Sequence, residues 1–126
     1  MLSRSGNDDE AHTARHQFGA AGVISVTSNV VPGLFARLMR EQDDRTNEAL
    51  QPLIKWLFHE PNPIPVNTAL AMLGIARPVF RMPYVPASRT QREAGALLLE
   101  PWLEHIPGNK GVHPLDDKDF HLVTRY

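Results

Sequence analysis

The fold is decided by the stretch Gly22-Val23-Ile24-Ser25-Val26-Thr27-Ser28-Asn29. Four of the five residues from Val23 to Thr27 are β-branched, and turn-forming residues stand on either side of them. This composition predicts a β-strand over residues 23–27. Neither face of the strand carries a charge, so we expect it to be buried on both faces, as strands of parallel sheets are.

Helical patterns flank this strand on both sides. Before it, the acidic run Asp8-Asp9-Glu10 suits a helix N-terminus and Gly19 suits its end, so we expect a helix through Phe18. After it, apolar side chains recur every three or four residues with Pro32 in the first turn, which predicts a second helix. Its apolar stripe consists of Val31, Leu34, Phe35, Leu38 and Met39. Residues 8–42 therefore follow the helix–strand–helix order of an α/β protein.

A buried parallel strand needs hydrogen-bonding neighbours on both sides. The later segments of the chain are poor neighbours, because they are polar or interrupted by proline. We therefore expect residues 1–42 to be the end of a larger sheet whose other strands lie elsewhere. For the same reason we expect the chain on its own to be marginally stable or prone to aggregation.

The sequence changes character after residue 42. We interpret Asp43-Asp44 as a linker, and an apolar stripe from Leu50 to Phe58 predicts a helix beyond it. The proline-rich run Glu60–Pro65 is predicted to be neither a helix nor a central strand. A short helix over residues 66–73 should stop at Gly74.

Three further segments complete the chain. Residues 77–86 contain three prolines, so they fit a packed arm better than a paired strand. Ser88 and Gln91 form a capping box that predicts a last helix through Leu99. Residues 120–126 alternate weakly between apolar and polar, which suits an edge strand.

Composition limits the class of protein. The chain has 126 residues, of which 42% are hydrophobic and 21% charged, with a formal net charge of −1. A nearly neutral chain has no basic field for nucleic acid and no polybasic patch for a membrane, so we expect neither partner. Cysteine is absent, which excludes disulfides and thiolate chemistry. The acidic run Asp8-Asp9-Glu10 argues against a transit peptide at the start.

Few side chains have the spacing of a chemical site. His12 and His16 lie four residues apart on one helix face, which can hold zinc, but no third ligand is evident and we interpret them as a solvated face. The hydroxyls of Ser25, Thr27 and Ser28 end the strand where α/β proteins place active sites, so we expect them to line a site rather than act as nucleophiles. We therefore predict no metal site and no cofactor.

The lysines and the second acidic run have ordinary interpretations. The chain has three lysines, Lys55, Lys110 and Lys118, and none is predicted to end a strand or to lie in a dry pocket. We expect no Schiff base on any of them. The run Asp116-Asp117-Lys118-Asp119 lacks the spacing of a calcium loop and is interpreted as a solvated turn.

Three motifs follow one another along the chain. They are Ser5-Gly6-Asn7-Asp8-Asp9-Glu10, then Gly22-Val23-Ile24-Ser25-Val26-Thr27-Ser28-Asn29, and then Glu60-Pro61-Asn62-Pro63-Ile64-Pro65. Together they resemble the dihydrodipicolinate synthase (4-hydroxy-tetrahydrodipicolinate synthase) family. The Asn-Asp-Asp-Glu form, the stretch Arg77–Pro86 and the ending Arg125-Tyr126 are similar to its plant and green-algal branch. The resemblance covers nearly the whole chain.

The resemblance implies a fold as well. It makes the chain an α/β protein, the C-terminal fragment of a TIM (β/α)8 barrel with a mostly α-helical C-terminal domain. Met1–Ser5 would be the end of strand seven and Val23–Thr27 would be strand eight, each followed by its helix. Residues 1–44 would then belong to the barrel, and residues 45–126 would form the helical domain with its polar tail. Because a barrel has about 250 residues, this chain would hold only its last part.

The resemblance also implies a reaction. The family is a class I aldolase-type lyase that condenses pyruvate with aspartate semialdehyde in lysine (diaminopimelate) biosynthesis, with pyruvate held as a Schiff base on a lysine. That lysine, the relay tyrosine and the main substrate-binding residues would precede this segment, so no catalytic residue is assigned here. The substrate-binding positions that carry over are Ile24 at the pyruvate site, Gly6, Asn7 and Asp8 at its mouth, and Asn29 at the exit of strand eight.

We therefore expect the isolated chain to be inactive. By resemblance, we expect the complete enzyme to be a homotetramer in the chloroplast. Two alternatives stay open from the sequence: a non-catalytic interaction or regulatory module that binds full-length subunits, and a fragment of another pyruvate-dependent aldolase such as N-acetylneuraminate lyase.

Overall fold

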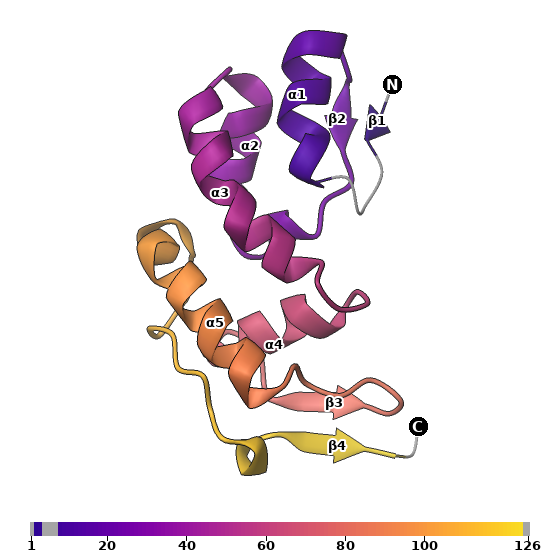
Figure 1. The fold of residues 1–126 in the computed structure, drawn as a ribbon, viewed down its shortest axis with the longest axis vertical. Helices are drawn as coiled ribbons and strands as arrows, with labels where there is room; N and C mark the ends of the chain where they lie inside the picture. Colours follow the sequence, from indigo (N-terminus) through magenta and orange to yellow (C-terminus); the bar gives the residue numbers. More distant parts are fainter. Residues whose placement is uncertain (1, 4–7, 125–126) are drawn as a thin grey trace.

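The computed structural model describes residues 2–3 and 8–124. The molecule is elongated, with the N-terminal elements gathered at one end and the last two strands at the other (Figure 1). The first elements form a β–α–β unit. Strand β1 (Leu2–Ser3) pairs in parallel with β2 (Gly22–Val23), and helix α1 (Asp8–Phe18) connects them. Helix α1 has the predicted bounds, and Gly19 follows it at φ 72° as expected of a residue that ends a helix.

Strand β2 is shorter than the sequence predicts. Only Gly22 and Val23 pair, and Ile24, which we expected to be buried, is 64% exposed. Within the described residues β2 has one neighbour, β1, and that neighbour is two residues long. Local β propensity cannot extend a strand beyond the partners that bond its backbone. The chain turns instead into the 3₁₀ helix η1 (Thr27–Asn29).

Helices α2 (Pro32–Arg40) and α3 (Asp44–Leu57) follow. Helix α2 has Pro32 in its first turn and buries Leu34, Phe35 and Leu38 from the predicted stripe. The interpretation of Asp43-Asp44 as a linker is wrong. Asp43 caps α3, because its side chain accepts a hydrogen bond from the Thr46 backbone N–H at 3.0 Å, and Asp44 is the first residue of the helix. Helix α3 leads from the upper to the lower part of the molecule (Figure 1).

The lower part contains two helices and a small parallel sheet. Helix α4 (Ile64–Met72) begins two residues before the predicted helix over residues 66–73. The expectation that the whole run Glu60–Pro65 is non-helical is therefore wrong for its last two residues, because a proline fits the first turn of a helix. Helix α5 (Arg89–Leu99) begins at the predicted Ser88 cap and continues into η2 (Glu100–His105). Its Ser88 hydroxyl accepts a hydrogen bond from the Gln91 N–H at 3.3 Å.

The arm and the tail pair with each other. Strand β3 (Val79–Arg81) runs parallel to β4 (His121–Val123), which follows the 3₁₀ helix η3 (Asp117–Asp119). The edge strand predicted near the end of the chain is therefore confirmed. The expectation that the arm would not pair is wrong, because Val79–Arg81 lies between the prolines of the arm and contains none itself, so it can join a ladder.

A single hydrophobic core joins the two parts of the molecule. It contains side chains from α2, α3, α4 and α5 and from the residue after η2, such as Leu38, Leu53, Met72, Leu99 and Ile106. No helix among the described residues is long and apolar enough to cross a membrane.

Candidate functional site

The carboxyl ends of β1 and β2 meet at a buried aspartate. Asp8 is the first residue of α1 and only 1% exposed. Its Oδ2 accepts a hydrogen bond from the Thr27 backbone N–H at 2.7 Å and another from the Ser25 hydroxyl at 3.1 Å. Ser25 Oγ also accepts from the Ser28 N–H at 3.0 Å. The start of α1 is thus tied to the turn that follows β2.

Two buried polar atoms in this cluster have no partner. Within the described residues, Asp8 Oδ1 and Thr27 Oγ1 are buried side-chain atoms without a hydrogen bond. Leaving such atoms unpaired is costly, so unpaired buried groups mark places where a further partner belongs. A cavity of about 300 Å³ opens beside the cluster, lined in part by Ser25, Ser28 and Phe35. The cluster therefore has unused hydrogen-bonding capacity at the end of a parallel sheet, where α/β proteins bind ligands.

The structure brings some of the predicted site residues together. Asp8 lies in this cluster, and Asn29 follows it in η1, where its side-chain amide donates to the Val26 carbonyl at 3.1 Å. Ile24, expected at the pyruvate site, is mostly exposed in this chain. Gly6 and Asn7 lie outside the described residues.

The histidine pair is not a solvated face, contrary to our interpretation. His12 is 2% exposed, and its Nε2 accepts a hydrogen bond from the Asp43 backbone N–H at 3.0 Å. His16 is partly buried, and its Nε2 donates to the Leu38 carbonyl at 2.7 Å. The two rings lie 4.5 Å apart between centroids. Burial, and then the neighbouring His16, lower the pKa of His12 below its ordinary value.

The other candidate groups remain at the surface. Lys55, Lys110 and Lys118 are all exposed, so none lies in the dry environment that lowers a lysine pKa for Schiff-base chemistry. Among residues 2–3 and 8–124, no three histidine or acidic side chains gather as a metal site.

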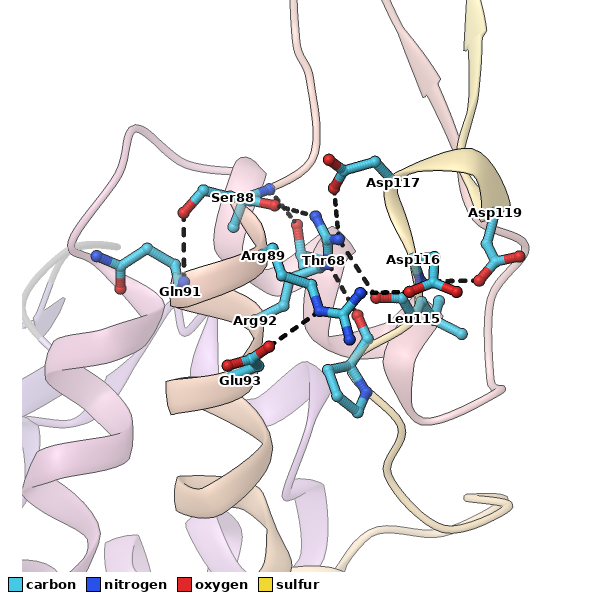
Figure 2. A network of polar contacts seen from close by, with 12 residues as sticks. Thr68, Ser88, Arg89, Gln91, Arg92, Glu93, Leu115, Asp116, Asp117 and Asp119 are labelled. Carbon is cyan, nitrogen blue, oxygen red and sulfur yellow. Dashed lines mark hydrogen bonds and ion pairs between the residues drawn. The ribbon is translucent and has the colours of Figure 1, made fainter.

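Sequence reasoning missed one buried polar cluster. Arg92 on α5 is 1% exposed and contacts the chain near Asp117 (Figure 2). A signal was present in the sequence, because Arg92 lies on the same helix face as Gly95 and Leu99, three and seven residues further on, and both are buried.

Comparisons with known proteins agree with the sequence motifs. The sequence model of the Dihydrodipicolinate synthetase family matches residues 2–101. The chloroplastic 4-hydroxy-tetrahydrodipicolinate synthase of Nicotiana tabacum is 55% identical over 124 residues, which cover 97% of this chain and 34% of that protein. A chloroplastic synthase of Arabidopsis thaliana is 56% identical over the same shares of the two chains.

More distant relatives match as well. The 4-hydroxy-tetrahydrodipicolinate synthase of Thermodesulfovibrio yellowstonii is 38% identical over 99 residues, which cover 73% of this chain and 34% of that protein. A crystal structure of a dihydrodipicolinate synthase superposes with a TM-score of 0.67 at 32% identity, covering 75% of this chain and 35% of that one. The chain spans about a third of the length of the curated relatives it matches.

Proposed function

The chain belongs to the dihydrodipicolinate synthetase family, and from that premise we propose that it provides the C-terminal part of a 4-hydroxy-tetrahydrodipicolinate synthase. The proposed reaction condenses pyruvate with aspartate semialdehyde in lysine biosynthesis. In this proposal β1 and β2 are strands seven and eight of a (β/α)8 barrel, and α1 and α2 are the helices that follow them. Residues 45–126 are then the helical domain appended to the barrel.

One observation carries this proposal. Strands β1 and β2 pair in parallel across an intervening helix, and Asp8 joins Thr27 and Ser25 at their carboxyl ends. That end of a β/α barrel is where its active site is built. The exposed Ile24 fits a surface that further strands cover. The unpartnered buried atoms of Asp8 and Thr27 leave hydrogen-bonding capacity at the same end of the strands.

The site residues have distinct roles in this proposal. Ile24 lines the pyruvate site, and Asp8, with Gly6 and Asn7, forms the mouth of the site, while Asn29 stands at the strand-eight exit. Asp8 acts by position, because its carboxylate fixes the Thr27 amide and the Ser25 hydroxyl and thereby the turn that follows Ile24. The polar rim of the site is then held rigid by hydrogen bonds before a substrate arrives.

The Schiff base is assigned to a lysine outside this chain. The chain's own lysines are exposed, which supports this assignment. The names of the plant relatives support a plastid location, and the family's oligomeric habit supports a homotetramer of complete subunits. The names of these relatives also favour the synthase over an N-acetylneuraminate lyase.

Trapping with borohydride tests the assignment. Pyruvate and a lysine amine form an imine with loss of water, and borohydride reduces the imine to a stable secondary amine that mass spectrometry detects. We expect no pyruvate adduct on Lys55, Lys110 or Lys118 of the purified chain, and no condensation above a control without protein. The complete Nicotiana tabacum relative, treated in the same way, serves as the positive control.

Two results would contradict the proposal. A saturable pyruvate adduct on one of these three lysines would place the catalytic amine within this chain. Turnover of pyruvate and aspartate semialdehyde by the chain alone would have the same consequence.

A further inference from the structure

A buried charge lies between helix α5 and the C-terminal tail. Arg92 is 1% exposed, although it lies in the first half of a surface helix. The carboxylate that it meets belongs to Asp117, whose side chain is 84% exposed. A buried guanidinium is stable only where hydrogen-bond acceptors replace the water it loses. The segments that supply those acceptors are the segments that Arg92 holds together.

Most of the acceptors come from the C-terminal tail. Arg92 Nε donates to the Pro114 carbonyl at 2.8 Å, and Nη2 donates to the Leu115 carbonyl at 3.3 Å and to Asp117 Oδ1 at 2.6 Å (Figure 2). Nη1 donates to the carbonyl of Ala87, between the arm and α5, at 2.7 Å. Arg92 thus makes three hydrogen bonds to the tail and one to the segment just before α5.

Aromatic contacts continue the same attachment. The guanidinium carbon of Arg92 lies 4.9 Å from the centroid of the Phe120 ring, within the range of a cation–π interaction. Phe120 in turn meets the buried Phe80 edge to face, with 6.0 Å between ring centroids. The tail therefore covers Phe80, an apolar side chain of β3.

The backbone of the tail is shaped to fit Arg92. Leu115 adopts φ 62°, a left-handed conformation that costs free energy for any residue with a side chain. This turn lies between the Pro114 and Asp117 contacts, and the Leu115 carbonyl bonds the guanidinium. No helix or strand contains Leu115, and its carbonyl is one of the acceptors of Arg92, so we expect Arg92 to stabilise this conformation.

Strand pairing alone holds the tail weakly. Strands β3 and β4 are three residues each and form a two-stranded sheet, which is marginal in water. Beside it, the His121 N–H donates to the Pro78 carbonyl at 2.8 Å and the Met82 N–H to the Val123 carbonyl at 2.9 Å. We therefore expect side-chain contacts of the tail, those with Arg92 foremost, to contribute much of its attachment.

We propose that residues 114–124 form a releasable strap over β3, and that Arg92 is its latch. The strap has two states. In the closed state the tail satisfies Arg92 and covers Phe80. In the open state the tail, its three acceptors and the Phe120 ring leave together, so Arg92 takes up water, Phe80 is exposed and one edge of β3 is free for another strand. This inference does not depend on the proposed function.

Hydrogen exchange followed by mass spectrometry tests the strap on the full 126-residue chain. We expect Arg92→Gln to raise the exchange rate of amides in residues 114–124 about tenfold or more, while those of α3 stay protected. The matched control is Arg89→Gln. Arg89 lies one turn earlier on α5, is half exposed, and also pairs with the tail through Asp116. We expect its loss to change tail exchange by less than about threefold.

A second pair of variants changes exposed residues of the tail, where a substitution leaves the core intact. Asp117→Ala removes the ionic partner of Arg92, and Lys118→Ala changes the next residue. We expect Asp117→Ala to raise tail exchange at least about threefold and Lys118→Ala to leave it unchanged. If Arg92→Gln also exposes α3, this second pair decides the question.

Two results would overturn the proposal. One is tail exchange within about twofold of the parent in both Arg92→Gln and Asp117→Ala with α3 protected, since local opening would then not involve the latch. The other is an equal rise in Arg89→Gln and Arg92→Gln, or in Lys118→Ala and Asp117→Ala, since the tail would then respond to any loss of charge.

Discussion

The two regions of the molecule treat their buried polar groups differently. In the sheet region, residues 2–3 and 8–42, the buried atoms Asp8 Oδ1 and Thr27 Oγ1 lack partners. In the helical region, residues 44–124, buried Arg92 makes four hydrogen bonds, and buried Thr68 donates to Ile64 and accepts from Ala87. The helical region completes its own interior. The sheet region leaves two buried atoms unpaired and exposes Ile24, as we expect where the rest of the proposed barrel would pack.

The tightest packing in the helical region gives the largest predicted effect. A Cβ on Gly95 would lie 2.3 Å from Trp56 Cζ2, and the Trp56 ring is held by its N–H bond to the Gln91 carbonyl at 2.9 Å. Gly95→Ala should therefore separate α5 from α3 and lower the free energy of unfolding by about 2 kcal/mol in urea denaturation. In the sheet region the matched change Gly33→Ala meets no atom within 4 Å, so it should stabilise α2 by up to about 1 kcal/mol. Equal effects at the two sites would remove this contrast.

The unpartnered cluster of the sheet region gives the next effect. Asp8→Ala deprives the buried Thr27 N–H of its acceptor, and should lower the free energy of unfolding by about 1–2 kcal/mol. Amides of residues 25–28 should exchange faster with solvent. The control is Asp9→Ala at the neighbouring exposed position, where we expect a change within about 0.5 kcal/mol. Unchanged stability in Asp8→Ala would show that the carboxylate contributes nothing until further strands cover it.

These two cases show what the sequence could and could not predict. Caps and apolar stripes are local signals, and they located α1, α2 and α5 closely. The length of β2 depends on pairing partners elsewhere in the chain, so the β propensity of its own residues predicted a longer strand than the structure has. The contacts of Arg92 with Asp117 and of His12 with Asp43 also join distant segments. Charged and imidazole side chains ordinarily lie at the surface, so nothing local to either residue indicates these contacts. The sequence motif indicated Asp8 as a site residue, but its hydrogen bond with Thr27 could be seen only in the folded structure.

The junction of the two regions should be sensitive to acid. His12 Nε2 accepts a hydrogen bond from the Asp43 N–H, so protonation at Nε2 would leave two donors facing each other. The imidazolium would also lie beside His16, and the exposed Asp44 carboxylate, 3.8 Å away, would stabilise the charge only weakly. Burial keeps the pKa of folded His12 below 6.5, so the unfolded chain binds the proton first. Stability is then fully present above about pH 6.5 and falls as pH decreases toward the folded pKa.

A pH series of urea midpoints measures this loss. His12→Gln keeps an acceptor for the Asp43 N–H but does not titrate, so it should flatten the slope below pH 6.5. A second loss at lower pH is expected from Asp43, whose pKa is lowered by the hydrogen bonds from Thr46 and Arg37. The same slope in the parent and in His12→Gln would contradict the role of His12.

The smallest effect is expected at Ile24. Because this side chain is mostly exposed, Ile24→Ser should change the free energy of unfolding of the chain by less than about 0.5 kcal/mol. In an assembled barrel the same change should weaken association with the preceding strands, because the side chain would be buried there. A large loss of stability in the chain alone would mean that Ile24 already packs within it.

Complementation tests most directly whether this chain is the C-terminal part of a synthase. The chain is mixed with the part of the Nicotiana tabacum synthase that precedes the matched region, and condensation of pyruvate with aspartate semialdehyde is measured. We predict that each piece alone shows background activity, that the mixture is active, and that Ile24→Ser reduces this activity. Two folded pieces that neither associate nor react, or full activity in this chain alone, would contradict this prediction.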